Sequence, residues 1–249
     1  MSPRPQPPAR DTAPVVQRVR VRYARRGRLR FTSHRDVARA LERALRRSGI
    51  PMAFSAGFSP HPKISYVGAA PTGTASEAEY LELGLAEETD PDDVRRRLDE
   101  ALPDGLDVLD VVRSGPGALP DRITGSRWEI QLPGLAPEVV QAAASTFLAA
   151  ETAPIQRRIK DGTRTVDARS AVVSLRVTTA DCAILEVVVR HLTPAVRPDD
   201  VLAALREIAD LVPPSPPLVT RTAQGPLADD GRIADPLDPD RAQSRAGSP

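Results

Sequence analysis

The 249-residue chain is long enough for one large domain or two small ones, and its 41% hydrophobic residues suffice for a packed core. Its single cysteine, Cys182, excludes an internal disulfide framework and a self-contained cysteine-ligated metal cluster. The sequence has no apolar run near the roughly 18 residues of a membrane span and no apolar stretch typical of a secretory signal, so we expect a cytoplasmic protein without membrane contact.

The net charge of +1 hides a polarised distribution of charge along the chain. Residues 1–63 carry 15 Lys and Arg against 3 Asp and Glu, residues 64–126 carry 5 against 14, and residues 127–249 carry 14 against 16. A basic segment of this density favours a nucleic-acid partner. A general preference for arginine over lysine would explain the type of cation, but it would not explain the near absence of acids.

The first half of the chain is predicted to form one ferredoxin-like unit, after a disordered Pro- and Arg-rich tail at residues 1–16. In its first strand, apolar residues alternate with arginines, as in a half-buried strand. Ser33 is the candidate N-cap of the first helix, and Gly49 ends that helix. The expected β-α-β-β-α-β order consists of a strand at 19–23, a helix at 34–48, strands at 64–67 and 80–85, a helix from Asp90 and a strand at 106–112.

The second half repeats this order at offsets of 107 to 109 residues, and the tetrapeptide PDDV recurs at Pro91 and Pro198. Such internal similarity predicts a tandem duplication. The expected elements are a strand at 128–132, a helix at 137–148, strands at 171–177 and 184–189, a helix from Pro198 and a strand at 218–220. We therefore predict an α+β fold of tandem ferredoxin-like units with antiparallel sheets, the first at 17–115 and the second at 126–220, followed by a disordered tail at 221–249.

One face of the helix at 34–48 is predicted to carry a stripe of arginines, namely Arg35, Arg39, Arg43, Arg46 and Arg47. Like charges on one helix face repel each other by a few tenths of a kcal/mol per pair. A phosphate backbone would relieve this repulsion and release counterions. The alternative is a solvated face without a partner. RNA is favoured over duplex DNA because the sequence contains no DNA-reading motif.

The segment FSAGFSPHPK at residues 54–63 is too broken for a helix and too rich in aromatic residues for a simple linker. Pro60 and Pro62 fix the backbone of His61, Gly57 permits a tight turn, and Lys63 adds a charge. The loop could contact RNA, it could present His61 as a general acid or base, or it could be structural, with its phenylalanines in the core.

His34, in the first turn of the arginine-rich helix, is the second candidate for catalysis, or for donating a hydrogen bond to a phosphate. A metal site built from His34, Asp36 and His61 would lack any recognised ligand spacing. The sequence therefore predicts neither a metal nor another cofactor.

The segment from Arg28 to Leu83 resembles the signature of a bacterial radical-SAM-associated protein family of unknown function. Its motifs are F-x-S-H-x-D-x-x-R, S-x-G-F-x-P-H-P and G-x-x-S-x-x-E-Y. The matching positions are Ser33, His34, Asp36, Ser55, Gly57, Phe58, Pro60, His61, Pro62, Gly73, Ser76, Glu79 and Tyr80. The resemblance implies no activity, but it implies a partner, a radical SAM enzyme on another chain, because one cysteine cannot supply the usual three cluster ligands.

The basic segment, the arginine stripe and the resemblance together predict an RNA-binding adaptor that acts with a separate radical SAM enzyme in RNA modification or processing. The nucleic-acid contacts are expected from the five arginines of the stripe and from Lys63. Two alternatives stay open. One is a metal-independent RNA endonuclease that uses His61, and the other is a protein-binding subunit whose basic face meets an acidic partner.

Overall fold

The computed structural model describes residues 13–56, 58–160 and 162–246, and these residues form two compact units. Unit 1 is made of residues 13–72, 78–117 and 237–246, and unit 2 of residues 73–77 and 118–236. No helix in the described ranges is long and apolar enough to cross a membrane.

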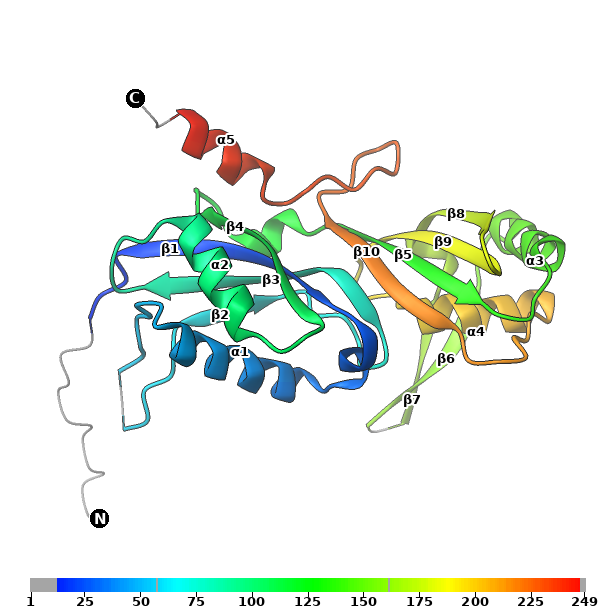
Figure 1. Ribbon diagram of the computed structural model, residues 1–249. Helices are drawn as coiled ribbons and strands as arrows, with labels where there is room; N and C mark the ends of the chain where they lie inside the picture. The colour runs from blue at the N-terminus through cyan, green and yellow to red at the C-terminus, as the bar shows by residue number, and fades with distance from the viewer. Residues whose placement is uncertain (1–12, 57, 161, 247–249) are drawn as a thin grey trace, which may run out of the picture. The chain divides into compact units, whose positions relative to one another are not determined.

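Unit 1 has the ferredoxin-like order of elements that the sequence predicts (Figure 1). Its strands are neighbours in the order β4-β1-β3-β2, and the pairs β1–β4 and β2–β3 are antiparallel. The elements are β1 (Gln17–Arg25), the 3-10 turn η1 (Gly27–Phe31), α1 (His34–Ser48), β2 (Ile64–Val67), β3 (Ala75–Leu85), α2 (Pro91–Ala101) and β4 (Leu106–Arg113).

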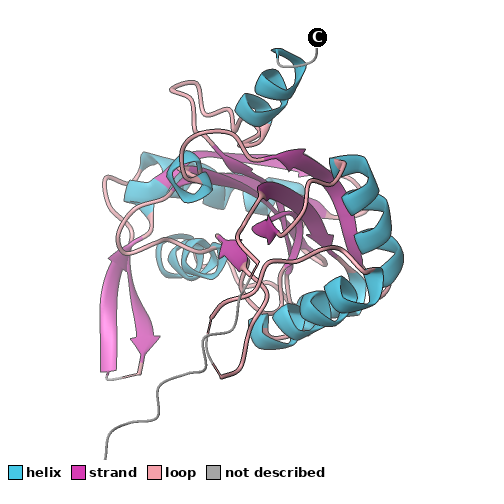
Figure 2. Ribbon diagram, turned by 90° about the vertical axis from the view of Figure 1, so that its left-hand side faces the viewer, coloured by secondary structure: helices cyan, strands magenta, loops and turns pink. Residues whose placement is uncertain are grey.

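The core of unit 1 lies between the sheet and the two helices, which lie side by side along one of its faces (Figure 2). The apolar positions of the strands, two residues apart, face the apolar stripes of the helices. This core is aliphatic, as the low aromatic content requires, and includes Val19, Val21, Val37, Leu41, Leu45, Leu83, Val94, Leu98 and Val108.

Unit 2 repeats the same topology, with strands in the order β10-β5-β9-β8, so the prediction of two ferredoxin-like units is confirmed. A separate two-stranded hairpin, β6–β7, is inserted after the first helix of this unit. At the edge of unit 2, Ala75 and Ser76 pair in parallel with Thr220 and Arg221. The elements are β5 (Gly125–Leu132), α3 (Pro137–Ala149), β6 (Pro154–Ile159), β7 (Gly162–Asp167), β8 (Val172–Thr179), β9 (Ala183–Arg190), α4 (Pro198–Ala209) and β10 (Leu218–Gly225).

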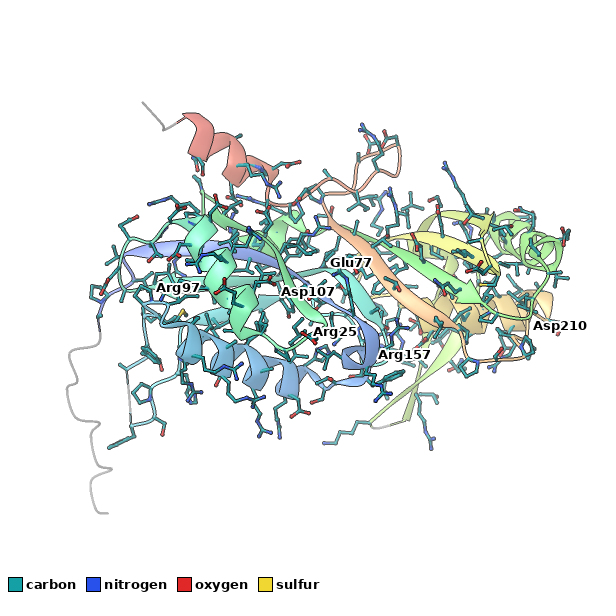
Figure 3. The ribbon with its side chains drawn as sticks, viewed as in Figure 1. Arg25, Glu77, Arg97, Asp107, Arg157 and Asp210 are labelled. Carbon is teal, nitrogen blue, oxygen red and sulfur yellow. The ribbon has the colours of Figure 1, made fainter. Side chains whose placement is uncertain are left out.

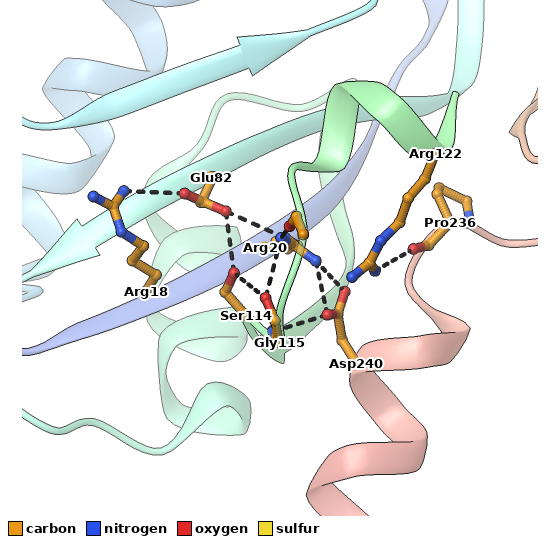
Figure 4. Close-up of polar contacts among 9 residues, drawn as sticks. Arg18, Arg20, Glu82, Ser114, Gly115, Arg122, Pro236 and Asp240 are labelled. Atoms are coloured by element: carbon orange, nitrogen blue, oxygen red, sulfur yellow. Dashed lines mark hydrogen bonds and ion pairs between the residues drawn. The ribbon is translucent and has the colours of Figure 1, made fainter. Parts of the chain in front are cut away.

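On the opposite face of the sheet in unit 1, one of the arginines that alternate along β1 is buried, whereas a half-buried strand would leave it in solvent. Arg20 points away from the helices and is buried beneath the C-terminal helix α5 (Asp238–Ala246). Its Nη1 donates to both carboxylate oxygens of Asp240, at 2.7 and 2.9 Å, and its Nε donates to Glu82 at 3.2 Å. Asp240 also accepts from the backbone N–H of Gly115 at 2.8 Å (Figure 4).

The prediction of a disordered tail over 221–249 does not hold for its described part, residues 221–246. Most of β10 falls in this range, Leu227 and Ile233 form a β-bridge, and α5 follows. The physical reason is that the polar residues of the segment meet charges of unit 1, because Arg241 donates to Asp110 as Asp240 accepts from Arg20. Of the predicted tail at 1–16, residues 1–12 lie outside the described residues, and the N–H of Val16 donates to the carbonyl of Leu85 at 2.8 Å.

Candidate nucleic-acid interface

The N-terminus of α1 is fixed by Ser33, as the sequence predicts. The Ser33 hydroxyl oxygen accepts from the backbone N–H of Asp36 at 3.2 Å, and the hydroxyl group donates to the carboxylate of Asp36 at 2.7 Å. At the other end, Gly49 adopts a left-handed conformation with φ of 64°, which favours glycine. The two ends fix which residues of α1 face the core and which face solvent.

Four arginines of α1 form an exposed basic face, here called the Arg face: Arg35, Arg39, Arg43 and Arg46. Arg39 lies 3.5 Å from Asp36, and Arg46 lies 3.3 Å from Glu42. Such solvent-exposed pairs on one helix contribute only a few tenths of a kcal/mol each. Arg35 and Arg43 make no hydrogen bond or ion pair with any residue that the structure describes. The Arg face therefore presents charge that the folded chain leaves largely uncompensated.

Arg47, the fifth arginine of the predicted stripe, has a different role at the C-terminal end of the helix. Its guanidinium donates to the carbonyl of Ala101, at the end of α2. In return Arg97 of α2, labelled in Figure 3, donates to the carbonyl of Ser48 at 3.0 and 2.7 Å. Each helix thus satisfies a C-terminal carbonyl of the other. Arg47 therefore joins α1 to α2 and is not part of the Arg face.

Residues 54–56 and 58–62, here called the His61 loop, follow the C-terminal end of α1 and are joined to each other by hydrogen bonds. The backbone N–H of Ser55 donates to the carbonyl of His61 at 2.9 Å, and the N–H of His61 donates to the Ser55 hydroxyl at 3.1 Å. Phe54 and Pro62 form a β-bridge at the base. Ser55 is therefore the clamp of the loop, and Gly57, which was expected to permit its turn, lies outside the described residues.

The side chains of the His61 loop do not fit one of the three alternatives, a structural loop with its phenylalanines in the core. Phe58 is 61% exposed and Phe54 is 37% exposed. The imidazole of His61 and the ammonium of Lys63 are also exposed, and neither has a hydrogen-bond or ion-pair partner in the described part of the chain. The loop thus offers two rings and two polar side chains to solvent.

Two further exposed aromatic residues lie beside α1. Phe31, in the turn before the helix, is 67% exposed. Tyr66 on the edge strand β2 is 41% exposed, and its hydroxyl interacts electrostatically with the carboxylate of Glu42. Partial burial, and then the nearby Glu42 carboxylate, raise the pKa of the Tyr66 hydroxyl to about 12. Its ring is therefore uncharged at every physiological pH.

The two candidate catalytic histidines are not brought together. His34 begins α1, whereas the His61 loop lies beyond the other end of the helix. Fifteen residues at 1.5 Å each separate these ends by about 22 Å. Among the described residues, no three or more His, Cys, Asp or Glu side chains are grouped so that they could hold a metal ion.

Most of the last motif of the resemblance, at residues 73–80, is buried. Ser76, Glu79 and Tyr80 are all nearly inaccessible to solvent. The carboxylate of Glu79 accepts from the N–H of Ala70 at 3.3 Å, and the Ser76 hydroxyl accepts from Arg221 at 3.3 Å. Gly73 has φ of 91°, which only glycine adopts easily. These residues hold the chain between β2 and β3 in place, and nearby Arg25 (Figure 3) contributes by donating to the carbonyls of Ala70 and Pro71.

Sequence reasoning missed a second basic element, the hairpin β6–β7 of unit 2. Its exposed cations, Arg158, Lys160 and Arg164, form no ion pair within the described residues, whereas Arg157 at its base donates to Asp200 at 2.9 Å. A signal was available, because the dipeptide Asp161-Gly162 between two strand-like runs is typical of a hairpin.

Comparisons with known proteins give a family and distant structural likenesses. Residues 18–198 match the model of a family described as an uncharacterized protein conserved in bacteria (DUF2344). The chain is similar to a chain in the crystal structure of a Cbf5-Nop10-Gar1 complex, at 12% identity and a TM-score of 0.43, over 89% of this chain. It spans about half, 53%, of that chain's length. A search of curated proteins gave no match.

Proposed function

We propose that this chain, which belongs to the DUF2344 family of uncharacterized proteins conserved in bacteria, is an RNA-binding accessory protein that acts with a separate radical SAM enzyme in RNA modification or processing. The observation that carries the RNA part is the Arg face. Four guanidinium groups stand exposed on one side of α1, and two of them, Arg35 and Arg43, have no ion-pair partner in the described part of the chain.

The Arg face has little compensating negative charge around it. Its two ion pairs, with Asp36 and Glu42, are exposed and weak, so they offset little of the mutual repulsion. A single phosphate backbone along the helix would neutralise several guanidinium groups at once and release its condensed counterions. Arginine also suits phosphate better than lysine does, since its planar fork can donate two parallel hydrogen bonds.

The radical SAM enzyme is proposed as the partner because of the motif resemblance and the number of cysteines. The chain has a single cysteine, Cys182, whereas a radical SAM cluster needs three cysteine ligands on its own polypeptide. In this proposal, one chain therefore binds the RNA and another carries out the radical chemistry.

Crosslinking in the native host tests both parts at once. Tagged protein is irradiated in cells and purified, its bound RNA is sequenced, and co-purifying proteins are quantified by mass spectrometry. We expect a defined class of RNA and a radical SAM enzyme, with the RNA lost in a variant carrying Arg39→Ala, Arg43→Ala and Arg46→Ala. Recovery of an acidic protein with no enriched RNA would overturn the RNA part in favour of a protein-binding subunit.

A further inference from the structure

The exposed aromatic residues of this chain are concentrated in one segment of the sequence. The sequence holds four Phe, three Tyr and one Trp. Four of these eight are buried, namely Tyr23, Tyr80, Trp128 and Phe147. The other four are exposed and fall within a short segment of unit 1: Phe31, Phe54, Phe58 and Tyr66. A chain that has few large rings leaves half of them in water around one helix.

These rings occur at successive points along the length of α1, the helix that carries the Arg face. Phe31 precedes the N-terminus of α1, Tyr66 lies beside the middle of the helix near Glu42, and the His61 loop with Phe58 follows its C-terminus. The flank of α1 opposite to Tyr66 is occupied by α2, through the contact of Arg47 with Ala101. Cations and rings therefore occur together over the length of about four helical turns.

An exposed phenyl ring needs a physical reason, because burying such a side chain stabilises a protein by about 1.5–3 kcal/mol. An unpaired nucleobase is a partner that explains rings and arginines together. Every base has a π-face that stacks on an aromatic side chain, while its phosphate attracts the guanidinium groups. In a duplex these faces are already stacked within the helix, and only the phosphates would be recognised.

We propose that unit 1 binds single-stranded RNA, with its phosphates along the Arg face and its unpaired bases stacked on Phe31, Tyr66 and Phe58. This inference rests on the proposed RNA-binding function and names the class of RNA. The arginines make this binding depend on salt concentration, and the aromatic rings make it depend on whether the bases are unpaired. The ligand is an unpaired segment, such as a loop or a strand end, rather than a continuous helix.

The test compares one short fluorescent RNA, single-stranded or annealed to its complement, by anisotropy with the full chain. We expect the single strand to bind more tightly than the duplex. Phe58→Ala and Tyr66→Ala should each weaken single-strand binding by about 5- to 150-fold, since one stacked base contributes about 1–3 kcal/mol. Duplex binding should change little. Val139→Ala, at an exposed apolar residue of α3, is the matched control and should change neither.

A substitution series separates stacking from plain apolar contact. Phe58→Trp should retain single-strand affinity, whereas Phe58→Leu should lose it, and circular dichroism checks that each variant is folded. The proposal is overturned if Phe58→Leu binds like wild type, or if single strand and duplex bind equally in wild type and in the Ala variants. In both cases RNA binding itself survives. If wild type binds neither RNA, this proposal and the proposed function fail together.

Discussion

Arg20 of β1 and Asp240 of α5 form a buried, two-point ion pair although 220 positions separate them in the chain. Their side chains are 1% and 0% exposed. Removing two charges from water is costly, and the structure offsets this cost with additional hydrogen bonds from Arg20 to Glu82 and from Gly115 to Asp240. The pair therefore fastens the C-terminal helix to unit 1.

The first prediction concerns this pair. Asp240→Ala should lower the free energy of unfolding of unit 1 by about 3 kcal/mol, because it leaves the Arg20 charge buried with one carboxylate fewer. Urea unfolding followed by circular dichroism measures the loss, and hydrogen exchange locates it to β1 and α5. The double variant Arg20→Met with Asp240→Leu should recover most of the stability, since it removes both charges.

The control lies on the same helix. Asp238 pairs with Arg241 at 2.6 Å, but its side chain is mostly exposed. Asp238→Ala should therefore cost less than about 1 kcal/mol. Equal effects of Asp238→Ala and Asp240→Ala would mean that the buried pair contributes nothing specific.

The βαββαβ order was predictable because it depends on local patterns, whereas α5 and the buried face of β1 were not. Period-two alternation in the strands and helical spacing in α1 and α2 each specify one apolar face. Nothing local predicts that α5 covers Arg20, because the sequence of α5 is polar and its charged partners Arg20 and Asp110 lie 220 and 131 residues earlier. Composition alone makes this segment look disordered, and the ion pairs that order it depend on the tertiary fold.

Only part of the candidate site was predictable from the sequence. The exposure of Arg35, Arg39 and Arg43 follows from helical geometry, so the Arg face was predictable from the sequence. The exposure of Phe58 was not, since an aromatic residue between two hydrophobic elements is more often part of the core. The roles of Ser55 as a loop clamp and of Arg47 as a carbonyl donor depend on contacts that only the folded chain shows.

His191 in unit 2 supports a prediction about pH. Its Nδ1 lies 3.1 Å from the carbonyl of Ile123, which can only accept, and its Nε2 lies 2.8 Å from the Ser126 hydroxyl. The neutral ring therefore donates from Nδ1 and accepts at Nε2. Burial lowers the pKa of His191 below its ordinary value, the Ile123 hydrogen bond partly opposes this shift, and the charge of Arg221 adds to it.

The sign of the pH effect follows from proton uptake. In the unfolded chain His191 titrates near pH 6.5, whereas the folded chain takes up this proton only at lower pH. Below about pH 6.5 the unfolded state therefore binds more protons, and stability falls as the pH drops towards the folded pKa. His191→Gln keeps a donor and an acceptor but does not titrate, so its melting temperature should fall less between pH 7.5 and pH 5.

Melting curves of wild type and His191→Gln over this pH range, with His61→Gln as the control that also removes one histidine, measure the difference. Parallel pH profiles for wild type and His191→Gln would exclude a contribution from His191.

The third prediction concerns the salt dependence of RNA binding. Each phosphate contact to a single strand contributes about 0.7 to the slope of log affinity against log salt. The variant with Arg39→Ala, Arg43→Ala and Arg46→Ala should therefore show a slope that is flatter by about 2. A control variant with equal loss of charge removes three exposed arginines elsewhere, Arg95, Arg190 and Arg206. Equal slopes for the two triple variants would mean that net charge, and not the Arg face, attracts the RNA.

The last prediction separates an RNA-binding protein from a nuclease and depends on His61. As a general acid or base, His61 would need a second group across the scissile phosphate, and the other candidate, His34, lies at the far end of α1. The loop instead holds His61 by its backbone, through Ser55, and leaves the imidazole in solvent. We therefore expect no cleavage of labelled RNA by wild type in the presence of a chelator.

His61→Ala should lower RNA affinity by less than about tenfold, the value of roughly one hydrogen bond, and His61→Gln should restore part of it. Ser55→Ala, which removes the clamp, should weaken binding to a similar degree if the shape of the loop matters. The contrary result is cleavage by wild type that falls about 100-fold or more in His61→Ala at unchanged affinity, and it would assign His61 a catalytic role.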